Sequence, residues 1–209
     1  MKQSRLKSGV LALALLGALG SARAGEGSGN EAASVQTTIV NVCEACHGKY
    51  GNSTDPSVPS LAGQGSAYLQ KQLAAFQAQL RVGVMSGIAM SLNETEIRDA
   101  ARYFSAQIPQ RDPLQVSDSI SSRRGAAIYD EGIVATRVPP CASCHALDGA
   151  GLASEFPRLA GQHSRYIADQ LRAFRSDSRL GTNAMMHKVS AKLSDGDITA
   201  VAVYIEGLR

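Results

Sequence analysis

Two pentapeptides carry the residue types and the spacing of a cofactor site. Cys43–His47 reads Cys-Glu-Ala-Cys-His, and Cys141–His145 reads Cys-Ala-Ser-Cys-His. Two cysteines three positions apart, followed at once by histidine, are the signature of c-type haem attachment. Each thiol forms a thioether with one vinyl group of the porphyrin, and the adjacent histidine can bring an imidazole nitrogen to the iron. We expect two covalently attached haems, with the following residues as attachment points and iron ligands: Cys43, Cys46 and His47 for the first, Cys141, Cys144 and His145 for the second.

Paired cysteines have other uses, namely structural zinc sites, redox dithiols and disulfides. A closed zinc site needs four protein ligands, and the first half of the chain offers only His47 beyond its two cysteines. A thioredoxin-type dithiol favours a strand–helix context and does not require the trailing histidine. Because the whole pentapeptide occurs twice, the sequence favours haem over these three alternatives.

The chain is a tandem repeat. The first motif returns 98 residues later, and at the same offset Pro59–Gln64 returns as Pro157–Gln162. Beyond Arg81 and its counterpart Arg179 the offset becomes 101, because the second copy has three more residues near Gly181–Ala184. Such dense matching in one order indicates an internal duplication. We expect two small domains, bounded as follows: leader 1–24, first domain 25–107, linker 108–117, second domain 118–209.

Each copy reads as a helix, the motif, a loop rich in Gly and Pro, and two further helices. In the first copy, helical spacing of apolar residues predicts helices over Ala32–Val42 and Ser66–Arg81, the second with Leu80 on its apolar stripe. Asn93–Glu96 and Ser194–Asp197 have the form of helix starts, with a capping residue and an acid three positions on. No pattern typical of strands and hairpins occurs in either half, so we expect an all-α fold.

The sixth ligand of each iron must come from later in each copy. Methionine suits this role because its thioether is a soft ligand that favours ferrous iron. Each half offers two methionines, Met85 and Met90 in the first and Met185 and Met186 in the second. Only Met85 and Met186 coincide when the repeats are paired, and we therefore predict these two as iron ligands. The two remaining histidines align in the repeat with non-ligating residues, His163 with Gly65 and His187 with Ser86, so we expect them at the surface or beside the haem propionates. The alternative is that His187, next to Met186, ligates iron and gives a haem with two histidine ligands.

Residues 1–24 have the form of a secretory signal peptide. A basic start precedes the apolar run Val10–Leu19, and Ala22-Arg23-Ala24 offers a cleavage site. Without this leader the chain has 17 basic and 18 acidic residues, and its halves carry net charges of −2 and +1. No concentrated positive footprint for nucleic acid remains. No later segment has the 18 apolar residues of a membrane helix, so we expect a soluble exported protein in the periplasm.

Taken together, the motifs resemble those of the cytochrome c4 family. They are Cys-x-x-Cys-His, Pro-x-Leu-Ala-Gly-Gln, Tyr-x-x-x-Gln-Leu-x-x-Phe, and a Met before the final helix, and they cover both halves of the chain. The resemblance implies two class I cytochrome c domains with His/Met ligation at both irons. It also implies that Pro59 and Pro157, each 12 residues after a motif histidine, turn their carbonyls toward the second nitrogen of that histidine; a plain loop proline is the alternative.

As to function, the resemblance implies a dihaem electron carrier without substrate chemistry, free or associated with the membrane. Its expected partners are a quinol-oxidising complex and a terminal oxidase. The alternatives are a dihaem enzyme, either a peroxidase or a thiosulfate-oxidising cytochrome, and a cytochrome subunit of a dehydrogenase or oxidase. A peroxidase needs an iron with an open position, and thiosulfate-oxidising types can use a distal cysteine. Since haem attachment uses all four cysteines and both halves offer a methionine, ligand availability disfavours an enzyme.

Overall fold

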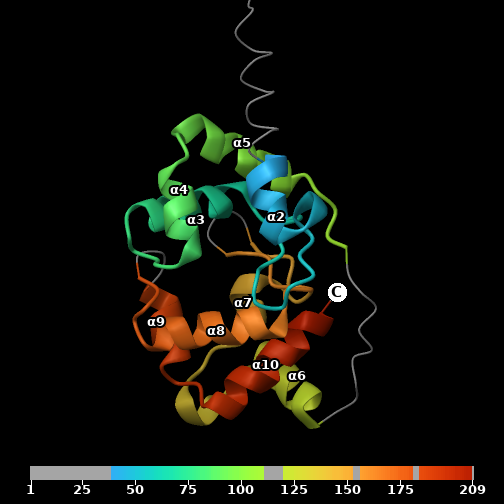
Figure 1. The fold of residues 1–209 in the computed structure, drawn as a ribbon. Helices are drawn as coiled ribbons and strands as arrows, with labels where there is room; N and C mark the ends of the chain where they lie inside the picture. Colours follow the sequence, from blue (N-terminus) through green and yellow to red (C-terminus); the bar gives the residue numbers. More distant parts are fainter. Residues whose placement is uncertain (1–38, 111–119, 153–155, 181–183, 209) are drawn as a thin grey trace, which may run out of the picture.

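The computed structural model describes residues 39–110, 120–152, 156–180 and 184–208. The expected leader, residues 32–38 of the first predicted helix, residues 111–117 of the linker and residues 181–183 of the insertion lie outside these ranges. Within them the chain forms two helical lobes, residues 39–110 and 120–208, one stacked on the other (Figure 1). The described residues contain only isolated bridges besides helices, so the all-α prediction is confirmed. None of the helices in these ranges has the length and apolarity to cross a membrane.

The α-helices from the motif helix onward follow the same order in both lobes, while a short 3-10 helix follows the motif helix in the first lobe and precedes it in the second. The first lobe contains η1 (Ile39–Cys43, a π-helical turn), α2 (Glu44–His47), η2 (Lys49–Gly51), α3 (Ser66–Gln77), α4 (Val84–Met90) and α5 (Glu94–Ser105). The second contains α6 (Ile120–Glu131), η3 (Val134–Thr136), α7 (Ala142–His145), α8 (Ser164–Arg175), α9 (Ala184–Ser190) and α10 (Asp195–Gly207). The motif helices α2 and α7 therefore correspond, and so do the pairs α3 and α8, α4 and α9, and α5 and α10.

The last helix of each lobe begins as the sequence predicts. At α5 the Asn93 side chain accepts a hydrogen bond from the Glu96 N–H, and the Glu96 carboxylate accepts one from the Asn93 N–H. At α10 Ser194 and Asp197 make the same reciprocal pair. These capping boxes satisfy backbone donors that have no partner within the helix. Four residues in each copy therefore determine where its last helix begins.

The second helix of the first lobe ends earlier than predicted. Helix α3 stops at Gln77 rather than Arg81, because Gln79 takes a left-handed φ of 56° and the Leu80 and Arg81 N–H groups turn back to the Ala75 carbonyl. The assignment of Leu80 to the apolar stripe was therefore wrong, and its side chain is exposed. The turn directs Arg81 toward the second lobe.

The core of the second lobe lies where α6 crosses α10. Ile128, Tyr129, Ile198 and Val201 are at most 1% exposed there. Gly125 permits this close crossing, since a Cβ at its position would lie 2.2 Å from the Ala200 carbonyl oxygen. The described cluster of the first lobe is smaller and is built on Leu69, Ala100, Ala101 and Phe104. Each core supports the motif helix of its own lobe, because Cys43 and Cys141 pack against these clusters.

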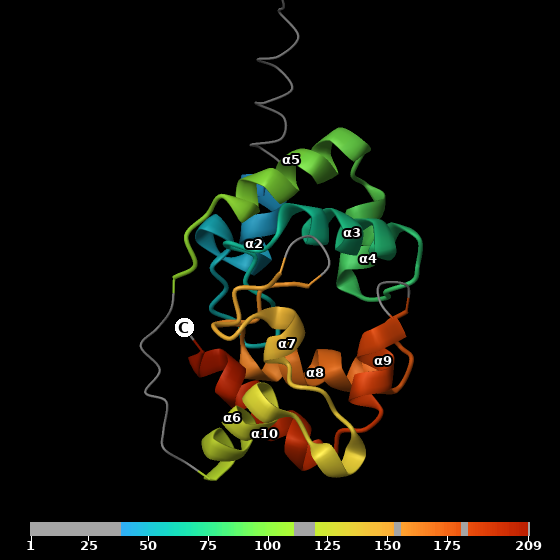
Figure 2. The same ribbon diagram turned by 180° about the vertical axis from the view of Figure 1, so that it is seen from behind.

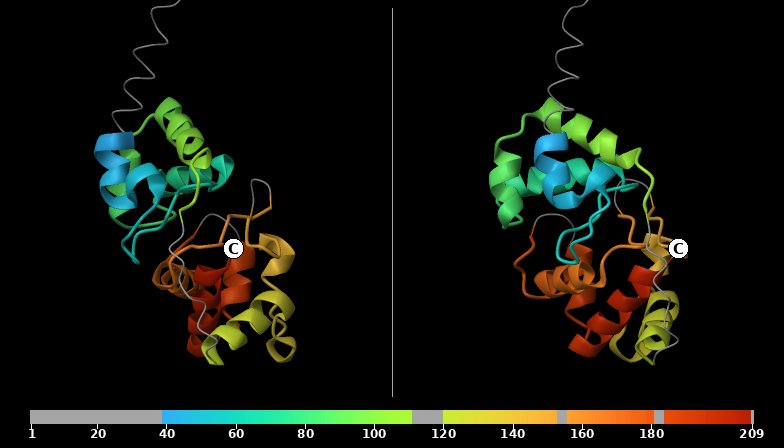
Figure 3. Two further views of the ribbon diagram at one scale, coloured as in Figure 1. Left: turned by 90° about the vertical axis from the view of Figure 1, so that its right-hand side faces the viewer. Right: turned by 45° about the vertical axis from the view of Figure 1, so that its right-hand side comes forward.

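The lobes meet through the long loops that follow the motif helices. Seen from behind and from the side, the loop after α2 and the loop after α7 fill the space between the lobes (Figures 2 and 3). A second line of contact joins the residues that follow α3 and α8, where Arg81 and Arg179 form an antiparallel bridge. The Leu180 N–H donates to the Leu80 carbonyl at 2.7 Å in the same place. Corresponding segments of the two copies thus face each other.

Candidate functional site

Both motif histidines are buried and oriented by a proline carbonyl. His47 Nδ1 lies 2.8 Å from the Pro59 carbonyl oxygen, and His145 Nδ1 lies 2.9 Å from that of Pro157. The two side chains are 6% and 8% exposed. Burial lowers the pKa of both histidines, although the proline carbonyls act in the opposite direction. Because a carbonyl only accepts, Nδ1 carries the hydrogen and Nε2 keeps a lone pair that can bind a metal.

The cysteines occupy the first turn and the approach of each motif helix. Cys43 precedes α2 and Cys141 precedes α7, while Cys46 and Cys144 lie within these helices. All four thiols are free, so the structure contains no disulfide between them. Burial raises the pKa of Cys43 and of Cys141 to about 11, which keeps both as neutral thiols. Each lobe therefore presents two thiols one helical turn apart beside a buried imidazole.

Tyrosines hold each motif helix against the rest of its lobe. The Tyr103 hydroxyl of α5 donates to the Glu44 carboxylate at 2.9 Å in the first lobe. In the second, the fully buried Tyr129 of α6 donates to the Ala146 carbonyl at 2.7 Å. The two tyrosines come from helices that do not correspond in the repeat, so each copy holds its motif helix by a different contact. Each one fixes the motif helix on which the cysteines and the histidine depend.

The four methionines differ in exposure. Met85 in α4 and Met186 in α9 are half-buried, and Met186 packs against the core of the second lobe. Met90 is 59% exposed and Met185 is 46% exposed. In the pairing that aligns Met85 with Met186, Ala89 aligns with Ser190, and both of these residues are fully buried. The helices α4 and α9 therefore share one buried face in that register.

The two histidines outside the motifs are both half-buried and contact carboxylates. His163 is 18% exposed and contacts both lobes, with Nε2 2.9 Å from the Ser53 carbonyl oxygen and Nδ1 3.7 Å from the Glu206 carboxylate. His187 is 19% exposed and lies 2.7 Å from the Asp177 carboxylate. Among the described residues no group of three His, Cys, Asp or Glu side chains could hold a metal ion.

Two arginines at the lobe interface have only neutral partners among their recorded hydrogen bonds. Arg81 donates to Gln72 of its own lobe and to Tyr166 and Gln170 of the other. Arg179 mirrors it, donating to Gln170 of its own lobe and to Tyr68 and Gln72 of the first. Each guanidinium also stacks on a phenylalanine ring of its own lobe, with 4.6 Å and 4.4 Å to the ring centroids. In the described ranges, neither guanidinium has a carboxylate among these hydrogen-bond partners.

Three buried side-chain N–H donors lack an acceptor among the described residues. They are Gln72 Nε2, Arg158 Nε and Arg179 Nε. A buried N–H group without a partner is costly, and a carboxylate is the acceptor that satisfies N–H donors and cations together. Haem carries two propionate carboxylates. The residues present therefore fit a haem in each lobe: a thiol pair, an oriented imidazole with a free Nε2, a half-buried thioether and unsatisfied donors for carboxylates.

Comparison with known proteins agrees with this geometry. The family described as Cytochrome c matches residues 122–209. Cytochrome c4 of Pseudomonas aeruginosa is 39% identical over 175 residues, which cover 80% of this chain and 84% of that protein. The chain belongs to the cytochrome c4 family. It is accordingly a dihaem electron-transfer protein, and its two motifs hold two covalently bound c-type haems.

A solved structure of the family has the same fold. Reduced recombinant cytochrome c4 from Pseudomonas stutzeri superposes with a TM-score of 0.74 and 37% identity, over 85% of this chain and 98% of that one. The similarity extends beyond proteins named cytochrome c4, since a thiosulfate dehydrogenase electron acceptor from Thiomonas intermedia is 33% identical over 78% of this chain and 76% of that protein. The expectation of tandem class I cytochrome c domains is confirmed.

The sequence did not predict which residues form the interface between the two lobes. Gln64 and Gln162, and Arg81 and Arg179, were visible as repeated pairs, but repetition alone does not tell which residues face the other copy. His163 was visible only as a departure from the repeat. Its position at the interface follows from the fold, because Ser53 lies 110 residues away in the sequence.

Proposed function

We propose that this member of the cytochrome c4 family carries electrons through two irons, each ligated by one histidine and one methionine. His47 and Met85 bind the first iron, and His145 and Met186 bind the second. When bound, each haem iron takes up and releases one electron by alternating between the ferric and the ferrous state. The observation that carries the assignment is the buried His–Pro pair that occurs once in each lobe.

The His–Pro pair supports ligation through Nε2. The proline carbonyl holds the hydrogen on Nδ1, and burial keeps the imidazole neutral. A histidine prepared in this way donates its Nε2 lone pair and cannot rotate away. Hydrogen bonding at Nδ1 also raises the basicity of the ring, which stabilises ferric iron. Both features suit an electron carrier, whose ligands must stay in place in both oxidation states.

Exposure and register support Met85 and Met186 over their neighbours. The two candidates are half-buried and align through the buried pair Ala89 and Ser190, whereas the side chains of Met90 and Met185 are more exposed. A thioether on the iron favours the ferrous state and raises the potential. With a histidine and a methionine on each iron, no coordination position is open to peroxide or another small substrate. The chain is therefore a carrier rather than a dihaem enzyme.

We assign the protein to the periplasm, from the leader at residues 1–24. The domains extend over 25–107 and 118–209, joined by the linker 108–117. Its donor and acceptor are membrane respiratory proteins, such as a quinol-oxidising complex and a terminal oxidase, reached by diffusion or by peripheral association with the membrane. The net charges of −2 and +1 on the two halves give each a distinct face for docking.

Haem counting and ligand removal test the proposal. A pyridine haemochrome assay should give two haems per chain. Met85→Ala and Met186→Ala should each remove half of the near-infrared band that reports Met-to-iron ligation in the ferric protein. The matched controls Met90→Ala and Met185→Ala should leave the band intact. An intact band in either ligand variant, or turnover of peroxide or thiosulfate by the wild type, would overturn the proposal.

A further inference from the structure

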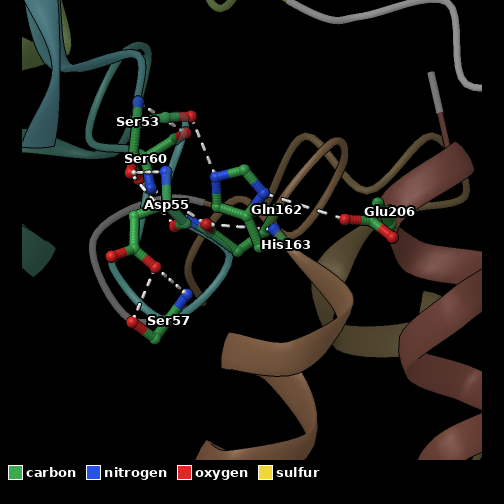
Figure 4. A network of polar contacts seen from close by, with 7 residues as sticks. All are labelled: Ser53, Asp55, Ser57, Ser60, Gln162, His163 and Glu206. Carbon is green, nitrogen blue, oxygen red and sulfur yellow. Dashed lines mark hydrogen bonds and ion pairs between the residues drawn. The ribbon is translucent and has the colours of Figure 1, made fainter.

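Each lobe reaches into the other lobe at the loop that carries the proline carbonyl. Gln162 of the second lobe makes two hydrogen bonds with Ser60 of the first: its Oε1 accepts from the Ser60 N–H at 2.9 Å, and its Nε2 donates to the Ser60 carbonyl at 2.9 Å. The neighbouring residue His163 donates from Nε2 to the Ser53 carbonyl. Figure 4 shows these side chains entering the first-lobe loop. Gln162 and Ser53 are each 8% exposed, so these bonds are shielded from water.

The contact with Ser60 acts on the same peptide unit that holds His47. The Ser60 N–H and the Pro59 carbonyl belong to one peptide bond, which is planar and rigid. Its oxygen accepts from His47 Nδ1 at 2.8 Å, and its N–H donates to Gln162 Oε1. Fixing the N–H therefore fixes the direction of the carbonyl. A peptide whose N–H is engaged is also polarised into a stronger acceptor.

The relation is reciprocal. Gln64 of the first lobe accepts from the Arg158 N–H at 2.8 Å and donates to the Arg158 carbonyl at 3.0 Å. Arg158 follows Pro157, whose carbonyl accepts from His145 Nδ1. The glutamine at the end of each Pro-x-Leu-Ala-Gly-Gln segment thus holds the peptide unit behind the other lobe's motif histidine. No side chain of the same lobe is recorded on either of these two N–H groups in the described residues.

The copies differ by one additional contact. His163 stands where the first copy has Gly65, and among the described residues it gives the first-lobe loop a third hydrogen bond from the other lobe. Glu206 of α10 faces His163 Nδ1 at 3.7 Å. Within the loop, the Ser53 N–H donates to Ser60 Oγ at 3.2 Å, which links the His163 contact to the Gln162 contact.

We infer that Gln162 and Gln64 are crossed positioning residues: Gln162 sets the hydrogen bond of His47, and Gln64 sets that of His145. The inference rests on the proposed role of these histidines as iron ligands. Loss of the glutamine weakens the proline carbonyl as an acceptor, lowers the basicity of the imidazole and destabilises ferric iron. Removing a glutamine from one lobe consequently raises the potential of the haem in the other lobe.

The matched variants Gln162→Met and Gln64→Met test this crossing. Methionine retains the length of the side chain and removes both hydrogen bonds. The readouts are the hyperfine-shifted haem methyl resonances of the ferric protein and the two midpoint potentials from a spectroscopic titration. Each haem is assigned beforehand with Met85→Ala and Met186→Ala. Gln162→Met should shift the resonances and raise the potential of the first haem alone, and Gln64→Met those of the second haem alone.

Two further variants separate positioning from folding. Gln162→Glu keeps an acceptor for the Ser60 N–H and should hold the first potential closer to the wild-type value than Gln162→Met does. His163→Gly introduces the residue found at the matching position Gly65 of the first copy. It should raise the potential of the first haem by less than Gln162→Met does. Shifts confined to the haem of the mutated lobe, equal shifts in both haems, or no shift would each overturn the inference. Failure of the ligand assignment shows separately, as an unaltered near-infrared band in the methionine variants.

Discussion

Replacing Ala146 tests how much backbone strain the second copy carries just after its motif helix. It follows His145 directly and has φ 67° and ψ 157°. Gly48, its counterpart in the first copy, has φ 74° and ψ 166°. This region of backbone space is open to glycine and strained for residues with a Cβ. The backbone turns the same way after the motif helix in both copies, but only the first copy has a glycine, the residue that suits this turn.

The expected effect of Ala146→Gly follows from two opposing contributions. Strain in this region costs about 1–3 kcal/mol and is released by glycine. The additional freedom of glycine in the unfolded chain costs about 0.5–1 kcal/mol. The net expectation is a gain of about 1 kcal/mol in the free energy of unfolding of the second lobe. For a domain of this size that corresponds to a rise in Tm of about 4–8 °C.

Denaturant and thermal unfolding of the haem-loaded protein measure this change, followed by far-ultraviolet circular dichroism and by the haem absorbance. Gly48→Ala is the matched control: its Cβ would meet the Asn52 carbonyl oxygen at 2.1 Å at a positive φ, so the first lobe should lose at least about 2 kcal/mol. A midpoint for Ala146→Gly at or below the wild-type value would refute the assignment of strain to this residue. So would a harmless Gly48→Ala.

Three other substitutions test separate parts of the fold. Gly125→Ala should cost about 3 kcal/mol because its Cβ would meet the α10 backbone, whereas Gly87→Ala, in open space within α4, should add about 1 kcal/mol; equal midpoints in unfolding would contradict both. Ser190→Ala removes a fully buried hydroxyl without a partner and should raise the free energy of unfolding by about 1 kcal/mol, and a lower Tm would count against this. Burial acts to raise the pKa of Asp197, but hydrogen bonds from Ser194 and Arg124 outweigh it and the pKa lies below its ordinary value. The contribution of Asp197 to the free energy of unfolding is therefore present above about pH 4 and lost as the pH falls through the lower, folded-state pKa. Asp197→Asn should flatten the acid side of a curve of stability against pH. An unchanged slope would contradict the pKa shift.

The repeat made the helical fold and the motif positions predictable, because both depend on local patterns. The capping residues at Asn93 and Ser194 begin their helices as expected, since a cap is a contact between residues three apart. The end of α3 was not predictable in the same way. Apolar spacing continues to Leu80, yet the chain leaves the helix after Gln77 and turns Arg81 toward Tyr166 and Gln170 of the other lobe.

The site was predictable up to the residues that bind the cofactor, and less so for the residues that support them. Motif spacing identified His47, and the resemblance to a family implied the Pro59 carbonyl, a contact that is present at 2.8 Å. The support behind that carbonyl comes from Gln162, 102 positions from Ser60. No periodicity or composition relates two loops that are so far apart in the sequence and belong to different lobes. A residue that departs from the repeat, such as His163, was the one available signal of a contact between the lobes.

The mirrored contacts of Arg81 and Arg179 describe an isologous interface within a single chain, because each copy offers the same surface that it receives. Two separate domains with these residues would pair as a symmetric dimer, at a cost in translational freedom. Covalent linkage turns that association into an intramolecular one, and the effective concentration of linked partners can be on the order of millimolar. The hydrogen bonds between the lobes therefore need less free energy to hold them together than separate domains would need. Once the pairing is covalent, either copy can also diverge alone, as His163 has done, without losing its partner.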